Sequence, residues 1–206
     1  RQMVDGACRS ELDLHCRLLN AMAYADTFAF EELWDRSCPI EGIDGHLRRL
    51  SRSHAFVHAC MNRALDLQNR IPDRLKLLWD VHLMAAGMDA EGWSNLVSTA
   101  HAKRLCGVCL RTMVDAEATF GTLVPSSVLD TLERQADAEP VDYRRLGDWR
   151  YMQWQNLRAL PGWSARVRWM WQRLFPPRGQ LEELHGPGRW SVLMLRRLRS
   201  GLSRLG

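Results

Sequence analysis

Apolar and aromatic residues at helical spacing constrain this chain more than any other feature. One face of a helix, at i, i+3, i+4, i+7, i+8 and i+11, is formed by Leu75, Leu78, Trp79, His82, Leu83 and Ala86. A second apolar side is formed by Leu77, Val81 and Met84. Because a helix that is apolar on two sides needs neighbours on both, we expect it to lie at the centre of a helical domain.

Capping residues indicate further helices on both sides of this segment. Ser and Asp side chains accept hydrogen bonds from the first backbone N–H groups of a helix, glycine commonly ends a helix, and proline is tolerated at its start. Four helical patterns have such a neighbour: Ser51 before 54–68, Asp89 before 90–102, Gly121 after 104–120 and Pro125 before 126–136.

The first residues follow a different period. Residues 3–8 and 11–18 are predicted to form two short strands, the second containing ELDLHCRL. Successive side chains alternate between the faces of a strand, so Asp13, His15 and Arg17 share one face and the leucines the other. This polar face is either solvated or lines a site. We therefore predict a mostly α protein, a helical bundle or array with a short N-terminal β-strand pair.

Length and composition suit a globular protein. The chain has 206 residues, of which 46% are hydrophobic, enough for one large domain or two small ones. No apolar run approaches the roughly 18 residues that a membrane-spanning helix needs, and we expect a cytoplasmic protein. The sequence opens at Arg1 without a methionine, and we expect further residues to precede it in the intact protein.

Charge and tryptophan are concentrated toward the C-terminus. Thirteen Arg and three acidic residues give residues 144–206 a net charge of +10, which leaves −6 for residues 1–143. Five of the nine Trp lie between residues 149 and 171. The change in composition predicts three parts: strands and a short helix in 1–45, a helical domain in 46–138, and a Trp/Arg-rich basic helical region in 139–206.

Seven segments in a fixed order carry a resemblance to a known family. They are DLHCRL, FAFEELWDRS, HAFVHACMNRA, LKLLWDVHLM, GWSNLVSTAHAKRLCGVCL, FGTLVPSSVLDTL and QRLFPP. Taken together, over roughly residues 10–177, they resemble the uncharacterised bacterial nucleotidyltransferase family of the polymerase-β-like superfamily. The resemblance implies that residues 1–45 are a remnant of an α/β nucleotidyltransferase domain, to whose sheet the strand pair would belong.

This resemblance implies Mg²⁺-dependent transfer of a nucleoside monophosphate from an NTP to an acceptor hydroxyl. Such enzymes hold the nucleotide phosphates at a Gly-Ser helix start and bind two Mg²⁺ with an Asp-x-Asp pair and a third carboxylate. Asp13 matches the third carboxylate, as a catalytic metal ligand. His15 and Arg17 would lie behind the metal ligands or beside the substrate. Neither Gly-Ser nor Asp-x-Asp occurs here, so we expect this chain alone to bind no Mg²⁺ and to be inactive.

A second hypothesis is a non-catalytic helical binding module. Its basic tail would contact nucleic acid, an anionic membrane or a partner protein. Trp and Arg between residues 148 and 175 suit base stacking and phosphate binding, although Trp at helical spacing more often packs in a core. Gly-Ser and Asp-x-Asp upstream of Arg1 would favour the nucleotidyltransferase, with an NTP and an acceptor as partners; their absence would favour the binding module.

Two other motifs have metal-site spacing. Cys106 and Cys109 form a Cys-x-x-Cys pair, but no second pair accompanies it and the surrounding pattern is that of a buried helix, so we expect no metal there. His54 and His58 are four residues apart, as in zinc helices, yet Ala55 stands where a metalloprotease needs glutamate. We expect the histidines to be packed and the cysteines to be reduced.

Two further features concern packing. Asp80 lies on a nearly apolar helix, and we expect it to have a buried partner. Near the C-terminus an apolar seam, spaced by three, four and three residues, is formed by Leu195, Leu198, Leu202 and Leu205. Docking on the protein's own core, lying in a membrane interface and pairing with another chain are its alternatives, and we favour the core.

Overall fold

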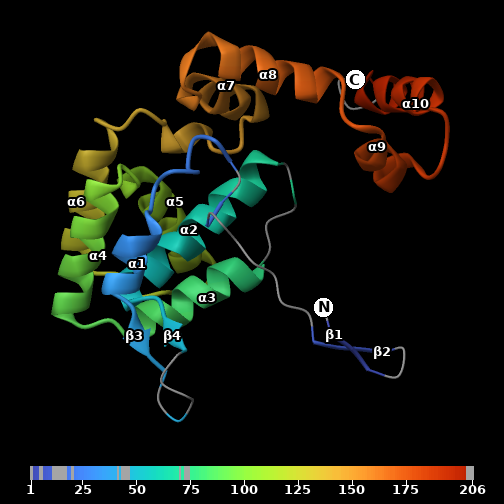
Figure 1. Ribbon diagram of the computed structural model, residues 1–206. Coiled ribbons are helices and arrows are strands. Elements are labelled where there is room, and N and C mark those ends of the chain that lie inside the picture. Colours follow the sequence, from blue (N-terminus) through green and yellow to red (C-terminus); the bar gives the residue numbers. More distant parts are fainter. Residues whose placement is uncertain are drawn as a thin grey trace. The chain divides into compact units, whose positions relative to one another are not determined.

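The structure, a computed structural model, describes residues 2–4, 7–10, 18–19, 21–40, 42, 47–69, 71 and 75–202 (Figure 1). Its described residues are mainly helical and include a short strand pair near the N-terminus, which confirms the predicted fold class. Two compact units divide the chain: the first unit, residues 1–156, and the second unit, residues 157–206. None of the described helices is both long and apolar enough to cross a membrane.

Helices of the first unit are α1 (Phe30–Asp35), α2 (Arg52–Gln68), α3 (Leu75–Ala86), α4 (Ala90–Ala102), α5 (Cys106–Phe120), α6 (Ser126–Ala136) and the 3-10 turn η1 (Tyr143–Arg145). Helix α7 (Trp149–Ala159) crosses the boundary between the units. The second unit continues with α8 (Gly162–Leu174), α9 (Arg178–His185) and α10 (Trp190–Leu202).

The strands form two small antiparallel pairs. β1 (Gln2–Val4) pairs with β2 (Ala7–Ser10), and β3 (Cys38–Pro39) pairs with β4 (Arg48–Arg49). A single strand over residues 3–8 was therefore a wrong prediction. The sequence between β1 and β2 is Asp-Gly, a dipeptide that signals a break between strands and that the prediction did not use. Most of the other predicted strand, residues 11–17, lies outside the described residues.

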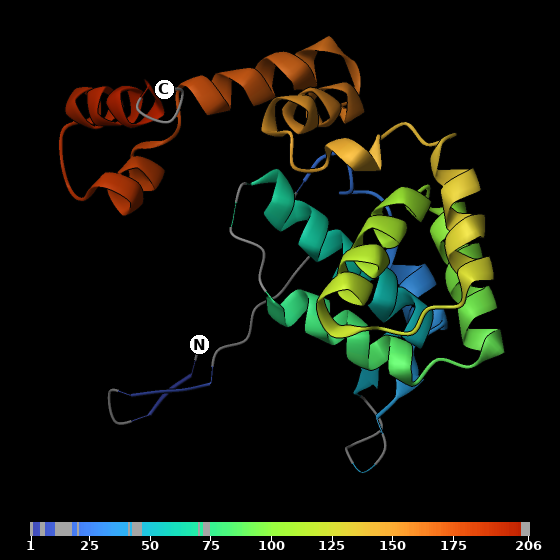
Figure 2. The same cartoon turned by 180° about the vertical axis from the view of Figure 1, so that it is seen from behind.

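Helix α2 lies in the middle of the first unit. It contacts α3, α4 and α5, as Figure 1 and the reverse view in Figure 2 show. Its fully buried side chains recur at helical spacing and include Phe56, Val57, Cys60 and Met61. The core of the unit is therefore built on α2.

Helix α3 is less central than its sequence predicted. Leu78, Val81 and Ala85 are buried, whereas Leu75, Trp79 and Leu83 are exposed. Both sides of this helix are apolar, so periodicity alone could not indicate which side packs against the core.

The predicted caps are confirmed at three helix ends. Ser51 Oγ accepts a hydrogen bond from His54 N at 3.4 Å, and Asp89 Oδ1 accepts one from Gly92 N at 2.8 Å. Gly121 ends α5 in the left-handed region, with φ of 64°, which glycine adopts without the steric cost of a side chain.

Residues 139–156 pack with the first unit. Glu139 accepts hydrogen bonds from Cys106 N at 2.6 Å and Gly107 N at 3.0 Å, which satisfies two N–H groups at the start of α5. Leu146 and Met152 are buried in the core. The predicted boundary after residue 138 was placed where the composition changes. The boundary between the two compact units lies later in the chain, after residue 156.

In the second unit α10 packs against α9. Leu193 on α10 and Leu181 on α9 are fully buried, while Leu195 and Leu198 are exposed. Within the second unit α10 therefore packs through its opposite face, and the docking of the seam on the protein's core stays a prediction. The side chains of Leu202 and Leu205 lie outside the described residues.

Candidate functional site

A groove between α2 and α3 is the best candidate for a ligand site. It has a volume of about 420 Å³, within the usual range for small-molecule sites. Three polar side chains enter its lining: His58 and Asn62 from α2, and Asp80 from α3. The remaining lining is apolar and consists of Ala55, Ala59, Leu77, Leu83 and Met84. A mostly apolar groove with a few polar groups is typical of a binding site for a small organic molecule.

Helical spacing explains how α2 forms its side of the groove. His58 and Asn62 are four residues apart and therefore lie one above the other on the same face. Ala55 and Ala59 lie on this face too, and their small side chains leave room beside the polar pair. Asn62 Nδ2 is 3.3 Å from His58 Nε2, so the amide donates when Nε2 carries no proton.

Asp80 supplies the negative charge of the groove. It is half-buried, and no buried partner for it is found among the described residues, so the expectation of one is wrong there. None of the described lining residues is Lys or Arg. The Asp80 carboxylate can therefore accept hydrogen bonds from a hydroxyl or ammonium group of a ligand.

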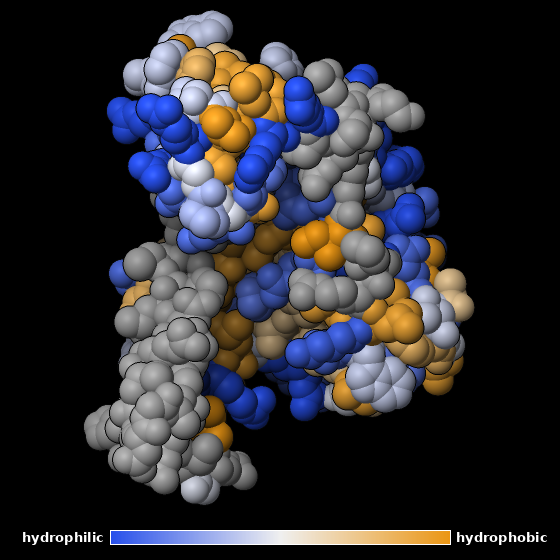
Figure 3. All heavy atoms as spheres, turned by 90° about the vertical axis from the view of Figure 1, so that its right-hand side faces the viewer, coloured by the Kyte–Doolittle hydropathy of each residue, from blue (hydrophilic) through white to orange (hydrophobic). Residues whose placement is uncertain are grey.

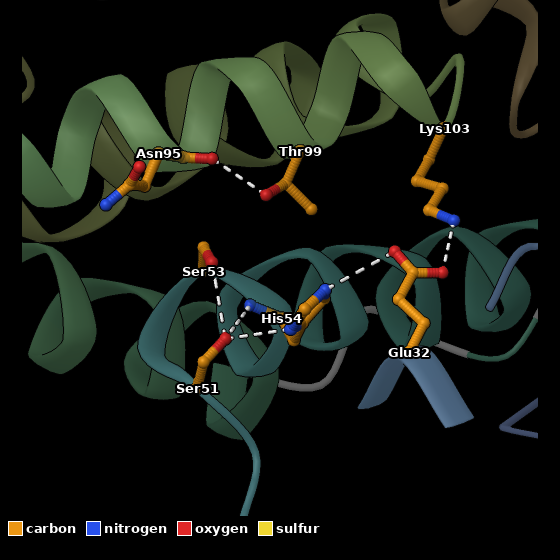
Figure 4. A network of polar contacts seen from close by, with 7 residues as sticks. All are labelled: Glu32, Ser51, Ser53, His54, Asn95, Thr99 and Lys103. Atoms are coloured by element: carbon orange, nitrogen blue, oxygen red, sulfur yellow. Dashed lines mark hydrogen bonds and ion pairs between the residues drawn. The ribbon is translucent and has the colours of Figure 1, made fainter. Parts of the chain in front are cut away.

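His54 belongs to a separate, buried network, shown in Figure 4. Its Nδ1 is 2.8 Å from Ser51 Oγ, and its Nε2 is 3.7 Å from Glu32 Oε1, too far for a hydrogen bond. Glu32 in turn pairs with Lys103 Nζ at 2.5 Å. The contacts join α1 to α2 and to the end of α4. Because His54 is almost fully buried, this network stabilises the fold and confirms the packing expected for His54, whereas His58 lines the groove.

Acid is expected to destabilise the protein through this network. Burial lowers the pKa of His54 below its ordinary 6.5. Burial by itself raises the pKa of Glu32, but the hydrogen bond and charge of Lys103 lower it overall, below its ordinary 4.5. Both groups bind protons more readily in the unfolded chain. Their contribution is therefore present above these ordinary values and is lost as the pH falls, first through His54 and then through Glu32.

Thermal unfolding between about pH 7 and about pH 5 checks this expectation. His54→Gln should show a smaller fall in Tm with pH than the wild type, although its Tm at neutral pH is lower. His101→Gln, which changes an exposed histidine on α4, serves as the matched control and should keep the wild-type dependence. Equal dependence in His54→Gln and the wild type would contradict the assignment.

The Cys-x-x-Cys pair lies inside the core. Cys106 donates to Gln135 Oε1 at 3.2 Å, and burial, with the charge of Glu139, raises the pKa of its thiol to about 12. A hydrogen bond with Cys60, together with burial, raises the pKa of Cys109. These thiols stay protonated and unreactive at neutral pH. Among the described residues no three His, Cys, Asp or Glu side chains lie close enough together to hold a metal ion.

The residues predicted to act in catalysis lie elsewhere in the sequence. Asp13, His15 and Arg17 are outside the described residues, so their roles stay predictions. Sequence reasoning missed His58 and Asn62 as groove residues. A signal was present, because two polar residues four positions apart accompany two alanines on the same helix face.

Comparison with known protein families identifies a match. The model of a family described as uncharacterised nucleotidyltransferase matches residues 1–135. This range contains Asp13 and all of α1 to α5, including both helices of the groove. No curated protein and no solved structure matches the chain.

Proposed function

Because the chain belongs to the family of uncharacterised nucleotidyltransferases, we propose that it is the C-terminal part of a Mg²⁺-dependent enzyme that transfers a nucleoside monophosphate from an NTP to an acceptor hydroxyl. We further propose that the α2–α3 groove binds the acceptor. The family match supports the class of reaction, and the polar groups of the groove support its role.

The reaction joins the acceptor oxygen to the α-phosphorus of the NTP. The bond from that phosphorus to the bridging oxygen breaks, pyrophosphate leaves and the acceptor hydroxyl loses its proton. In the intact protein Asp13 would be one of the carboxylates that hold Mg²⁺. Bound Mg²⁺ orients the triphosphate and lowers the pKa of the attacking hydroxyl.

The charge of the groove favours an acceptor over a triphosphate. Asp80 contributes a carboxylate, and the described lining contains no Lys or Arg to bind phosphate. A triphosphate would be repelled by this carboxylate, whereas hydroxyl and ammonium groups can donate hydrogen bonds to it. Asn62 can both donate and accept, which suits a ligand with several hydroxyl groups. The acceptor class that fits best is therefore a small polyol or amino sugar.

The experiment uses the full-length gene product. Pyrophosphate release is measured with Mg²⁺, each of the four NTPs and a set of polyols and amino sugars. Asp13→Asn should lower kcat by more than about 100-fold. Loss of a side chain that only hydrogen-bonds to a metal ligand costs about 10–100-fold in activity, and Asp13 would be a ligand itself. Asp80→Asn should raise the KM for the acceptor by about 10–100-fold and leave the KM for the NTP unchanged, because a hydrogen bond to a charged group is lost.

Asp130→Asn is the matched control for Asp80→Asn. It removes an exposed carboxylate from α6, away from the groove lining, and should leave both KM values unchanged. A higher KM for the NTP in Asp80→Asn would contradict the role proposed for the groove. Undiminished activity of Asp13→Asn, or no pyrophosphate release by the wild type, would contradict the reaction proposed for the chain.

A further inference from the structure

Helix α8 carries an apolar face that is exposed along its whole length. Its members follow i, i+4, i+7, i+8 and i+11. We call them the α8 stripe: Trp163 at 75% exposed, Val167 at 53%, Met170 at 40%, Trp171 at 61% and Leu174 at 63%. Single exposed apolar residues are ordinary, but five that share one helix face form a continuous surface that indicates a binding partner.

Arginines border this stripe on both sides. At 100° per residue, Arg166 and Arg173 lie along one edge, and Arg168 lies beyond the other. The second unit as a whole has ten Arg and two Glu, a net charge of +8, and contains no Asp or Lys. A cationic border around an apolar face is complementary to a surface that is apolar inside and anionic outside.

The end of α8 adds a second cationic feature. Arg197 on α10 donates to the backbone oxygen of Arg173 at 2.5 Å, and the charges of the two arginines repel each other. Burial, together with repulsion from Arg197, lowers the pKa of Arg173. A phosphate placed here would relieve that repulsion. Exposed apolar side chains continue on α10 with Val192, Leu195 and Leu198, and Figure 3 shows hydrophobic atoms between hydrophilic ones over α9 and α10.

From these observations we propose that the α8 stripe docks on an anionic lipid bilayer, with the helix lying in the plane of the interface. Its 13 residues make a helix about 20 Å long, shorter than the hydrocarbon core is thick. Trp prefers the interface between headgroups and acyl chains, and the aliphatic members enter the apolar layer. The flanking arginines then reach anionic headgroups while their stems lie along the apolar face.

The composition of the stripe favours lipid over nucleic acid. Val167, Met170 and Leu174 separate the two tryptophans of the stripe, and aliphatic or thioether side chains offer no flat face on which a base can stack. Hydrocarbon accepts all five side chains. The proposal does not depend on the nucleotidyltransferase reaction, because it rests on residues beyond the family match.

Cosedimentation of the whole chain with two kinds of vesicle tests the proposal. One kind contains phosphatidylcholine alone, the other phosphatidylcholine mixed with phosphatidylserine. The chain should bind the mixed vesicles and bind the neutral ones much more weakly. Val167→Asn combined with Leu174→Asn should weaken binding to the mixed vesicles by at least about tenfold, since two buried aliphatic side chains are lost. Arg168→Gln combined with Arg173→Gln should weaken it by about tenfold or more.

Matched controls lie on the first unit. Val114→Asn with Leu123→Asn changes two exposed aliphatic residues there, and Arg134→Gln with Arg150→Gln removes two exposed charges. Both pairs should bind like the wild type, and circular dichroism confirms that each variant is folded. Equal binding to the two vesicles, or wild-type binding by the stripe variant, overturns the proposal. Failure to bind either kind of vesicle also overturns it. If the chain then binds duplex RNA or dimerises, and the variant of Val167 and Leu174 does not, the stripe is assigned to nucleic acid or to a second copy.

Discussion

Replacing Phe56 with alanine is expected to lower the free energy of unfolding by about 3–5 kcal/mol, the largest effect of any change considered. Phe56 is fully buried on α2, and its ring meets the ring of Trp93 on α4 edge to face, with centroids 6.1 Å apart. The truncation removes this contact and the apolar area, and leaves a cavity around which the neighbouring helices relax only partially. Denaturant unfolding followed by circular dichroism measures the loss.

Phe30→Ala is the matched control for Phe56→Ala. Phe30 is on α1, stacks on Trp34 and is largely exposed, so its truncation should cost less than about 1 kcal/mol. Phe56→Leu keeps part of the volume and should fall between the two. If Phe56→Ala and Phe30→Ala lost similar amounts, α2 would not be the centre of the core.

Gly107→Ala is expected to destabilise the protein by about 1–3 kcal/mol, although alanine favours helices more than glycine does. A Cβ on Gly107 would lie 2.7 Å from Tyr143 Cβ and 2.8 Å from Tyr143 Cδ1. The nearest atom is attached directly to the backbone, so rotation of the tyrosine cannot remove the overlap. The η1 turn must move away from α5, and this strain exceeds the gain of about 0.5–1 kcal/mol in helix propensity.

Gly179→Ala also changes a glycine in a helix, but it is not expected to destabilise the protein. Gly179 lies in α9, and nothing lies within 4 Å of the position that its Cβ would take. The change should therefore leave Tm unchanged or raise it. A comparison of Tm for the two variants separates close packing at Gly107 from the general effect of glycine in helices. Equal Tm values for Gly107→Ala and the wild type would show that η1 packs less closely on α5.

Several parts of the fold follow from local sequence. Ser51 and Asp89 cap α2 and α4 as predicted, and Gly121 ends α5 with a positive φ. These residues act through hydrogen bonds and backbone preferences within one turn, so their neighbours in the sequence are sufficient to interpret them. Asp13 was predicted to be a site residue only through the resemblance to a family, since its alternating strand pattern by itself favoured a solvated face.

The candidate groove could not be predicted in the same way. His58 and Asp80 lie on different helices, and each had an ordinary structural interpretation by itself. Their shared position depends on how α2 and α3 pack. Asn62 beside His58 was a weak local signal, but nothing near it in the sequence indicated that a carboxylate from α3 would line the same groove.

The ends of the main helices follow from local sequence, because caps, glycines and periodicity operate over a few neighbouring residues. Packing between helices selects the faces that are buried: Leu78 rather than Leu75 on α3, and Leu193 rather than Leu195 on α10. The same packing places Glu139 at the start of α5, 33 residues earlier in the chain. Apolar burial has no direction of its own, so where several faces of a helix are apolar, the neighbouring helices select the face that packs.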